Sequence, residues 1–322
     1  MILKPFTLMI AVCAFVSFES SCAGEVKIKQ VDDGFRFEID GELFTHWQTK
    51  DWKVGYLYPV VGPDGENITR NYPMIDDVEG EQTDHPHHRS IRFSHRKVNG
   101  FSFWAPDSHK DGTTAEIKFV KVEKIDGGEL VIWNDWLGNG KLLLQEKLRL
   151  NVISLENKQV LLDYDVELTA PNEDVTFFDE KDGGLGVRVP AWMVVKNRHT
   201  KTGTGTILNS EGDKNTDSWG KRASWSSYFG PNPKGKVLGI TVFDHPSNMR
   251  YPTHWHARDY GLNTANRFGK GFFEAKSGAK KGDGDYTIKK GETLKLRHRI
   301  YFHHGDPETA KVAEKFAAYA KE

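Results

Sequence analysis

The segment from Ala115 to Thr169 decides the fold: AEIKFVKVEKIDGGELVIWNDWLGNGKLLLQEKLRLNVISLENKQVLLDYDVELT. Apolar and polar residues alternate along it, and the breaks Asp126-Gly127-Gly128 and Gly138-Asn139-Gly140 interrupt the alternation. A period of two places every second side chain on the same face, as in a half-buried β-strand. The segment therefore predicts four antiparallel strands joined by tight turns, at 115–122, 130–136, 142–152 and 159–169.

Similar patterns on both sides extend the sheet structure. A hairpin is expected at 26–39, and further strands at 52–61, 101–104, 219–229, 237–243 and 294–302. The clearest helix closes the chain, with Asp306 as its cap, Pro307 in its first turn, and an apolar face of Val312, Ala313, Phe316, Ala317 and Ala320. The sequence predicts an all-β fold, in which residues 25–322 form one large antiparallel β-sandwich domain with a C-terminal α-helix.

Residues 1–24 are expected to be a signal peptide. Lys4 gives a positive start, the apolar run from Phe6 to Phe18 is too short to anchor in a bilayer, and small residues follow it. Two processing routes remain open, namely cleavage after Ala23 or lipidation of Cys22. Both predict export, either to the periplasm or as a lipoprotein of the outer membrane or cell surface, with membrane contact only through the lipid.

Composition narrows the classes of partner. The only cysteines of the sequence are Cys13 and Cys22, so residues 25–322 contain no disulfide. The formal net charge is -1, which argues against nucleic-acid binding by bulk charge. Nine Trp and nineteen Phe fit a β-rich protein with flat rings for packing on sheets and on sugar faces.

The most unusual stretch is the first His/Arg segment, residues 84–96, with the sequence DHPHHRSIRFSHR. It holds four imidazoles and three guanidiniums in thirteen residues. Imidazoles carry protons near neutral pH and bind metals, while guanidiniums are forked donors for carboxylate, sulfate or phosphate. The combination favours an anionic substrate that also needs a proton moved, and a purely structural set of hydrogen-bonded rings is the alternative. If a strand follows Pro86, then His87 and Arg89 face one way, and His88 and Arg92 the other.

The second His/Arg segment, residues 244–261, opens with the same Asp-His-Pro tripeptide as the first. We expect the two segments to be neighbouring rim loops that line one cleft. In the second segment, His254, His256, Arg258 and Tyr260 alternate by two, so that on a strand they would share one face; a structural polar ladder would show the same pattern.

Two aspartates and a possible metal site are the remaining candidates for functional groups in these segments. Asp84 and Asp244 each precede His-Pro, which favours a role in orienting an imidazole over a carboxylate pair for glycoside hydrolysis. The histidines at 85, 87, 254 and 256 could bind a divalent metal, but no cysteine joins them and their spacing matches no standard zinc signature. The sequence therefore favours a site with neither metal nor cofactor.

Several motifs together resemble one family. They are TDHPHHR at 83–89, NG at 99–100 with FW at 103–104, DGGLGVR at 182–188, WG at 219–220, HPSN at 245–248, WHARDYGL at 255–262 and NRFG at 266–269. They resemble the secreted bacterial family labelled methane oxygenase PmoA-like, from which this chain departs at Ser90 and Arg267. The label conflicts with the sequence, because a membrane oxygenase needs transmembrane helices. The resemblance instead implies a β-sandwich akin to those of galactose mutarotases and polysaccharide lyases, in bacteria that degrade complex glycans.

The favoured function is a carbon–oxygen lyase or dehydratase that eliminates across a uronate-containing oligosaccharide. Such a reaction needs a base, an acid, and a cation that neutralises the carboxylate. The expected catalytic residues are His87, His88, His256 and Tyr260, with a nearby guanidinium such as that of Arg258 lowering the pKa of the tyrosine. The expected contacts to the anionic oligosaccharide are Arg70, Arg89, Trp104, Arg188, Trp255 and Arg258. A mutarotase-like or glycoside-hydrolysing enzyme and a non-catalytic glycan-binding module are the alternatives.

Overall fold

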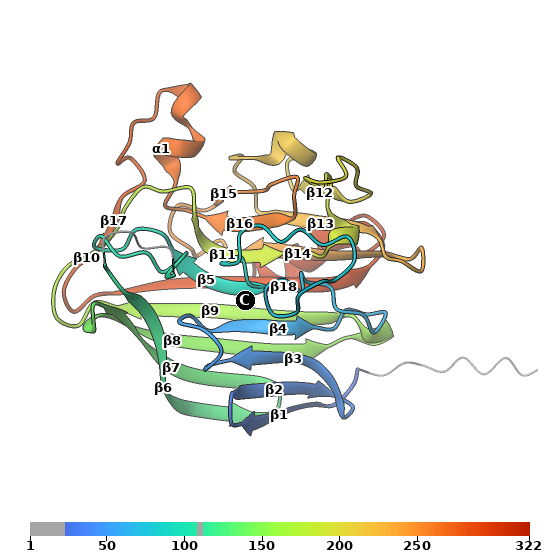
Figure 1. Ribbon diagram of the computed structural model, residues 1–322, viewed down its shortest axis with the longest axis horizontal. Helices are drawn as coiled ribbons and strands as arrows, with labels where there is room; N and C mark the ends of the chain where they lie inside the picture. The colour runs from blue at the N-terminus through green and yellow to red at the C-terminus, as the bar shows by residue number, and fades with distance from the viewer. Residues whose placement is uncertain (1–22, 108–111) are drawn as a thin grey trace, which may run out of the picture.

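The computed structural model describes residues 23–107 and 112–322, which form two facing β-sheets (Figure 1). The expected signal peptide and the lipidation site at Cys22 fall on residues 1–22, outside the described residues. All strand pairings within the named sheets are antiparallel. The predicted all-β sandwich is therefore confirmed.

The first sheet has the strand order β1-β2-β3-β4-β5-β11-β16-β15. Its strands are β1 (Val26–Val31), β2 (Gly34–Ile39), β3 (Glu42–Gln48), β4 (Tyr56–Val60), β5 (Ile91–His95), β11 (Gly183–Arg188), β16 (Leu262–Asn266) and β15 (His254–Trp255).

The second sheet has the order β12-β13-β14-β18-β9-β8-β7-β6. Its strands are β12 (Thr206–Asn209), β13 (Trp225–Pro231), β14 (Val237–Asp244), β18 (Thr293–His304), β9 (Val160–Thr169), β8 (Lys141–Ser154), β7 (Glu129–Gly138) and β6 (Ala115–Asp126). The predicted meander is thus the run β6 to β9, and residues of β8 alternate between buried and partly exposed as the sequence pattern requires.

Shorter elements fill the remaining connections. A two-stranded sheet pairs β10 (Val175–Phe177) with β17 (Tyr286–Ile288). The helices are α1 (Lys270–Phe273) and α2 (Val312–Tyr319), with 3-10 turns η1 (Glu156–Lys158), η2 (Ala191–Met193), η3 (Asn215–Ser218) and η4 (Ala275–Ser277). No helix of the described residues is both long and apolar enough to cross a membrane.

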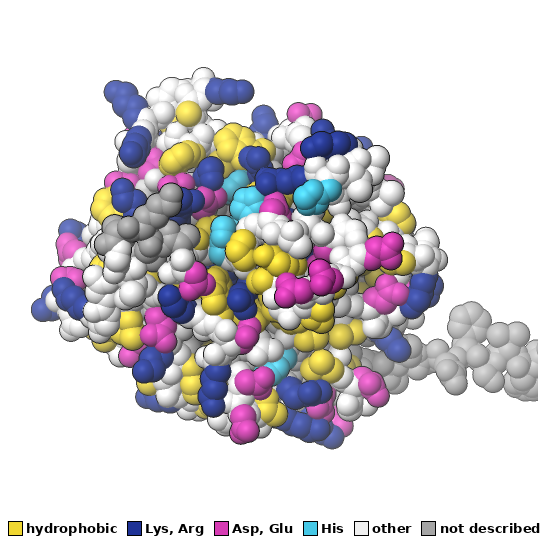
Figure 2. All heavy atoms as spheres, viewed as in Figure 1, with side chains coloured by type: hydrophobic (Ala, Val, Ile, Leu, Met, Phe, Trp, Pro, Cys, Tyr) yellow, Lys and Arg dark blue, Asp and Glu magenta, His cyan; other side chains and the backbone are white. Residues whose placement is uncertain are grey.

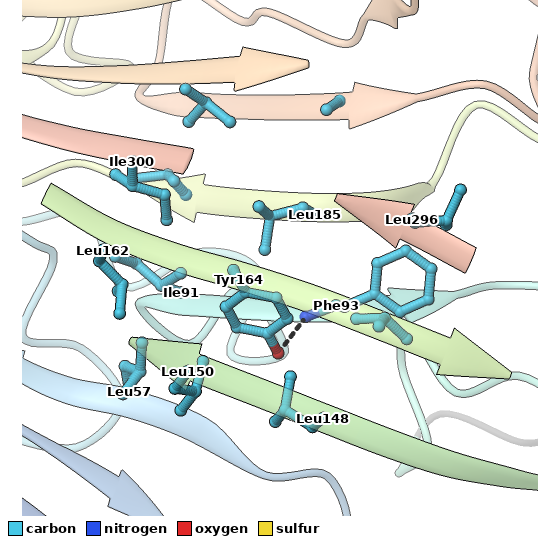
Figure 3. Packing of buried hydrophobic residues seen from close by; sticks show 14 of the residues in the cluster. Leu57, Ile91, Phe93, Leu148, Leu150, Leu162, Tyr164, Leu185, Leu296 and Ile300 are labelled. Atoms are coloured by element: carbon cyan, nitrogen blue, oxygen red, sulfur yellow. Dashed lines mark hydrogen bonds between the residues drawn. The ribbon is translucent and has the colours of Figure 1, made fainter. Parts of the chain in front are cut away.

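The core lies between the two sheets. Leu57, Ile91 and Leu185 of the first sheet face Leu148 and Leu162 of the second, and all five side chains are buried (Figure 3). The Tyr164 hydroxyl of β9 also accepts a hydrogen bond of 3.2 Å from the Phe93 backbone N–H of β5. Burying each aliphatic side chain contributes about 1.5–3 kcal/mol, so this shared interior holds the sheets together without a disulfide.

The C-terminal helix begins later than the sequence indicated. The Asp306 carboxylate does cap a turn, accepting a hydrogen bond of 2.8 Å from the Thr309 N–H. Lys311, at a φ of 53°, then interrupts the helical path, and α2 starts at Val312. It buries Val312 and Tyr319 against the outer side of the second sheet, whereas the expected Ala313 and Ala317 are exposed.

Three expected strand regions are also shorter than predicted. The aromatic run at 101–104 is a loop held by a single bridge between Val98 and Phe101. Strand β13 begins at Trp225 rather than at 219, and β4 begins at Tyr56 rather than at 52. In each case aromatic composition suggested a strand where the chain instead forms a loop, and the loop before β4 contacts β6 of the second sheet through a single bridge between Val54 and Ile117.

Candidate active site

The strand register places the polar side chains of the two His/Arg segments on the outer face of the first sheet. Arg92 is opposite Gly186, which is opposite Thr264 on β16. The His256 N–H donates to the Thr264 carbonyl at 2.9 Å, which adds His256 to the same row. Directly opposite residues in antiparallel strands point to the same side, so this row faces outward. In Figure 2, histidine side chains gather near the middle of the face shown.

The neighbouring row points into the core and includes Trp255. This residue pairs with Ala265, which pairs with Leu185, and all three are buried. Trp255 is 0% exposed, and its indole N–H donates to the Ala223 carbonyl at 2.9 Å. The expectation that Trp255 contacts substrate is therefore wrong, because the alternation that turns His254 and His256 outward turns Trp255 inward.

Two further expectations for the second segment need correction. Tyr260 does not continue a strand with His254 and His256, because β15 ends at Trp255 and Tyr260 lies in the turn at 259–261. The second Asp-His-Pro opens the loop that joins β14 to β15, but its aspartate does not face a cleft. Asp244 is 0% exposed and is held by Arg267 at 2.7 Å and Asn248 at 2.7 Å. It belongs to a buried polar network, and the shared tripeptide does not reflect a shared role.

The first segment enters the site as a loop, since β5 begins only at Ile91. Strand parity therefore does not apply to residues 87–90. The side chain of Arg70 holds this loop, donating to the carbonyls of Asp84 at 2.7 Å, His85 at 2.8 Å and His88 at 3.1 Å. Arg70 is 2% exposed, so it shapes the loop and does not reach a substrate as expected.

Asp84 and His85 form an oriented pair. His85 Nδ1 lies 2.7 Å from Asp84 Oδ2, as the sequence predicted for an aspartate that orients an imidazole. Burial alone would raise the pKa of Asp84, but the His85 hydrogen bond and the guanidiniums of Arg188 and Arg70 outweigh it and hold that pKa below its usual range. Arg198 adds an ion pair of 2.9 Å. An ionised carboxylate accepts a hydrogen bond from Nδ1–H, so in the neutral ring the lone pair lies on Nε2. Nε2 has no hydrogen-bond partner within residues 23–107 and 112–322.

The His85 ring lies between Tyr260 and His88. Its centroid is 5.5 Å from that of Tyr260, at an interplanar angle of 5°, and 4.7 Å from that of His88, at 10°. Guanidiniums surround the phenol ring, with Arg198 at 3.9 Å and Arg188 at 4.7 Å from its centroid. The two segments therefore meet at this stack, through His85 of the first Asp-His-Pro and Tyr260 near the end of the second segment, and not through both Asp-His-Pro openings.

The acidity of Tyr260 differs from the sequence-based expectation. Arg188, Arg258 and Arg198 each lower its pKa, but the cost of burying a phenolate is larger and raises the pKa above its ordinary value. The hydroxyl makes no hydrogen bond with any of the described residues. Tyr260 is thus a protonated phenol at neutral pH, suited to give a proton.

A small hollow of about 10 Å³ adjoins the stack. Its lining residues are His88, Arg89, Ser90, Arg92, Trp104, Gly186, Arg188 and Leu262. A volume of this size holds about one water-sized group, such as a single carboxylate oxygen. At Gly186 a side chain would reach the Trp104 ring, since a Cβ there would lie 3.5 Å from it. Glycine at this position therefore keeps the hollow open.

Several residues that line this hollow carry buried polar nitrogens without hydrogen-bond partners among the described residues. Nε and Nη1 of Arg188, Nε of Arg89, Nε1 of Trp104 and Nδ1 of His88 are buried and have no partner among the described residues. Each such group costs about 1–3 kcal/mol when left unsatisfied. Four lining residues with unpartnered nitrogens, three of them certain N–H donors, make a hollow suited to an acceptor-rich anion, and we call this group, Arg188, Arg89, Trp104 and His88, the anion pocket.

Neighbouring residues position the anion pocket. Arg92, 3% exposed, donates to the His87 carbonyl at 2.7 Å and to the Trp104 carbonyl, and its guanidinium lies between the rings of Trp52 and Trp104. Arg89 is held by an ion pair of 2.7 Å to Asp51 and lies over Trp52. Arg92 therefore holds the backbone of the residues around the pocket, while Arg89 contributes an unpartnered Nε to it.

The remaining catalytic candidates, His87 and His256, flank the pocket. Burial, and then the charge of Arg92, lowers the pKa of His87 to about 3. Burial lowers the pKa of His256 to about 4, against the opposing charge of Asp182, which lies 3.7 Å from its Nδ1. Both rings are neutral at neutral pH. His87 contacts His88 edge-on at 4.5 Å, whereas His256 lies two strands from β11, roughly 10 Å away.

The structure does not gather the histidines that were considered as metal ligands. His254 Nε2 binds Glu274 at 2.8 Å at the sheet edge, away from His85 and His87. Within the residues that the structure describes, no group of three or more His, Cys, Asp or Glu is arranged to hold a metal ion. His254, His256, His85 and His87 are therefore not one ligand set here.

The chain matches the "Family of unknown function (DUF6807)" over residues 35–317. It belongs to this family. No curated protein matches the chain. The resemblance to PmoA-like proteins that the motifs suggested stays a prediction.

Solved structures with partial similarity to this DUF6807 protein are larger. A polysaccharide lyase shares 13% identity at a TM-score of 0.35, covering 89% of this chain and 33% of its own. An α-galactosidase from Lactobacillus brevis shares 9% identity at a TM-score of 0.38, covering 87% of this chain and 39% of its own. A 4-α-glucanotransferase from Thermococcus litoralis shares 12% identity at a TM-score of 0.37, covering 88% of this chain and 40% of its own. The chain spans between a third and two fifths of their lengths. At these scores the similarity carries no argument about function, which has to come from the site itself.

Sequence reasoning missed several residues of the site. Arg198 contacts both Asp84 and Tyr260, and Trp52, Tyr56 and Asp51 hold Arg89. Arg198 lies in a turn without a periodic pattern, and although Trp52 and Tyr56 fall within an expected strand, nothing in the sequence connects that strand with residues 84–96. An acidic residue next to an aromatic residue, as in Asp51-Trp52, is too common in sequences to indicate a functional site.

Proposed function

We propose that this DUF6807 protein is a carbohydrate-active lyase that eliminates across a uronate-containing oligosaccharide and leaves an unsaturated uronic acid. The observation that carries the proposal is the anion pocket, with its unpartnered donors, directly beside the His85–Tyr260 stack. A uronate carboxylate is an acceptor-only group that matches these donors, and the carbon next to it carries the proton that must leave.

The anion pocket would hold one carboxylate oxygen. Removing the α proton moves negative charge onto the carboxylate, so donors that already point at this oxygen stabilise the transition state. Arg188 supplies two unpartnered nitrogens, Nε and Nη1, while its Nη2 is held by Asp84 at 3.0 Å, which fixes the direction of the fork. His88 is fully buried with a pKa far below its ordinary value, so it acts here as a neutral donor through Nδ1.

His85 is then the better base than His88 or His87. Asp84 holds its Nδ1, so the lone pair of Nε2 is available to take the proton. Its side chain is 31% exposed, against 5% for the whole of His88, and substrate can reach it. The arrangement of carboxylate, imidazole and substrate follows the logic of oriented general bases.

Tyr260 supplies the acid. It is protonated at neutral pH, and its ring lies parallel to that of His85 at 5.5 Å. In the reaction His85 takes the α proton, the electron pair of the C–H bond forms the double bond, and the β C–O bond breaks as Tyr260 protonates the leaving oxygen. The products are an unsaturated uronate and an alcohol, or water if the leaving group is a hydroxyl. Transfer of the proton from His85 back to Tyr260 restores the enzyme.

The alternatives fit the geometry less well. Glycoside hydrolysis needs two available carboxyl groups. At this site Asp84 is held by His85 and three arginines, and Asp182 by Arg96 and Lys181, both at 2.8 Å. A module that only binds glycans has no use for an oriented imidazole beside a protonated phenol. Elimination uses all of these groups.

The test is a panel of oligosaccharides that contain glucuronate, galacturonate, mannuronate or guluronate. We expect ultraviolet absorbance from a new double bond conjugated to the carboxylate, and no absorbance with His85→Ala, which should still bind the same oligosaccharide. Mass spectrometry separates a lyase, which splits the chain, from a dehydratase, which removes water. New reducing ends without absorbance would establish a hydrolase, and binding without any product would establish a binding module; either result refutes the proposal.

A further inference from the structure

A second hollow lies on the same face, at the edge formed by β15. It has a volume of about 380 Å³ and is lined by Arg222, Arg250, His254, Lys270, Glu274 and Asp283. Helix α1, to which Lys270 belongs, stands above β15 in Figure 1, and Figure 2 shows Lys and Arg side chains around it. Unlike the anion pocket, this hollow has room for a whole substituent of a sugar.

The guanidiniums of the hollow are fixed without being neutralised. Arg222 donates from Nε to the Pro252 carbonyl at 2.9 Å. Arg250 donates to the carbonyls of Gly284 at 2.7 Å and Asp285 at 2.8 Å. Backbone carbonyls hold both cations in place, and neither guanidinium makes an ion pair within residues 23–107 and 112–322, although the charges of Asp179 and Asp285 act on Arg250 from a longer distance. Fixed guanidiniums without an ion pair are how a preorganised anion site is built.

The acids of the hollow are already engaged. Glu274 accepts from His254 at 2.8 Å, and Asp283 accepts from the Lys280 N–H at 3.0 Å. Lys270 has no ion-pair partner in the described residues. Three cations therefore face two carboxylates, and the hollow keeps a net positive charge, since burial lowers the pKa of His254 and favours its neutral form.

A polar row connects the hollow with the anion pocket. His254 and His256 turn to the same side of the sheet, and Phe273 packs against both rings, at 5.4 Å and 6.1 Å. Between the two sites, Nδ1 of His256, Oγ1 of Thr264 and Nε1 of Trp219 are buried without partners among the described residues. Polar groups thus run along the outer face from one site to the other.

The strand register gives the separation of the two sites. Arg188 is opposite Leu262, and His254 is opposite Asn266, four residues further along β16 and two strands from β11. Strand geometry makes this roughly 13 Å along the strands and 10 Å across them, or about 16 Å on the diagonal. One sugar ring cannot reach both sites, but an oligosaccharide can.

We propose that the hollow binds a second acidic substituent, a carboxylate or a sulfate, on another sugar of the chain whose uronate reacts in the anion pocket. The inference rests on the proposed function for its account of the first site. Such a second contact would make the enzyme prefer long oligosaccharides with several acidic groups over short ones that reach the anion pocket alone. The second contact would favour binding of long chains and leave the chemical step unchanged.

The test compares the double variant Arg222→Ala/Lys270→Ala with Lys276→Ala/Lys281→Ala. The control pair removes the same charge from exposed lysines of the neighbouring loop that do not line the hollow. We expect the first variant to raise the KM for a long oligouronate at least tenfold, with kcat and the KM for a diuronide unchanged. The control should match the wild type. Carboxylated and sulfated chains of equal length, used side by side, show which acid the hollow prefers.

Calorimetric binding in the His85→Ala background separates this inference from the proposed function. Charge-dependent binding of long chains by this variant, together with no turnover of the same chains by the wild type, supports the hollow and refutes the lyase. The proposal for the hollow is overturned if the enzyme turns over and the double variant leaves the KM unchanged. It is also overturned if the double variant raises the KM equally for short and long chains. Absence of binding by every chain also overturns it.

Discussion

Replacing Tyr260 by Phe separates the chemistry of the site from its stability. The substitution removes one hydroxyl and keeps the ring that stacks on His85 and on the Arg198 guanidinium. Because the hydroxyl has no hydrogen-bond partner in the described residues, the free energy of unfolding should change by less than about 0.5 kcal/mol. Loss of a general acid typically lowers the rate 10²- to 10⁴-fold, which adds about 3–5 kcal/mol to the barrier.

The assay is the initial rate of ultraviolet absorbance with the best uronate substrate, together with thermal unfolding of the same preparation. Tyr301→Phe is the matched control, because Tyr301 lies on β18 of the second sheet and its hydroxyl is bound to Gln159 at 2.7 Å. This control should lose about 1 kcal/mol of stability, a fall in Tm of about 2 °C, and keep its turnover. The two variants should therefore show opposite patterns.

Two results would refute the reasoning. If Tyr260→Phe keeps full turnover, the phenol is not the acid. If the Tm of Tyr260→Phe is several degrees below that of the wild type, the hydroxyl has a structural partner. A loss of rate would then no longer report on proton transfer. A rate loss that disappears with a substrate carrying a very good leaving group would instead support the assignment, since such a group needs no proton.

The remaining predictions concern the anion pocket, the loop, pH and metals. Arg188→Lys keeps a positive charge but loses the fork, so kcat/KM should fall at least 10²-fold while the protein stays folded; a fall below threefold would exclude a carboxylate contact. Arg70→Met should lower stability by about 3 kcal/mol or more in urea unfolding, because it leaves buried carbonyls and Asp84 without their donor; an unchanged midpoint would contradict the structural role assigned to Arg70. Burial lowers the pKa of His95 and of His303 to about 4, so at these two positions the unfolded chain binds more protons than the folded one; their contribution to stability should be fully present above about pH 6.5 and fall towards pH 4, by up to roughly 3 kcal/mol for each histidine. Burial raises the pKa of Glu146 to about 7, which opposes this trend, so the measurement is made in a Glu146→Gln background, where unfolding midpoints that are flat between pH 7.5 and 5 would count against the prediction. Treatment with EDTA should leave turnover unchanged, and a loss restored by a divalent cation would return the histidines to the role of metal ligands.

The sequence by itself determined the class of fold and the region of the site. Alternation over residues 115–169 fixed four strands, because a period of two lets only one face enter the core. The density of His and Arg in residues 84–96 pointed to the loop that carries Asp84, His85 and His88. The role of Asp84 as a partner of imidazole was also readable, since the two residues are adjacent in the chain.

Only the tertiary structure decided which of these side chains meet. The antiparallel register of β11, β15 and β16 turned Trp255 inward and His256 outward, and a register is a property of paired strands that one strand does not reveal. The turn at 259–261 placed Tyr260 on His85, and the loop after Asn197 supplied Arg198, although neither contact has a local sequence signal. Burial, too, depends on distant segments, and it outweighed the effect of the arginines, which do lower the pKa of Tyr260 as expected, because removing a phenolate from water costs more free energy than the nearby positive charges supply.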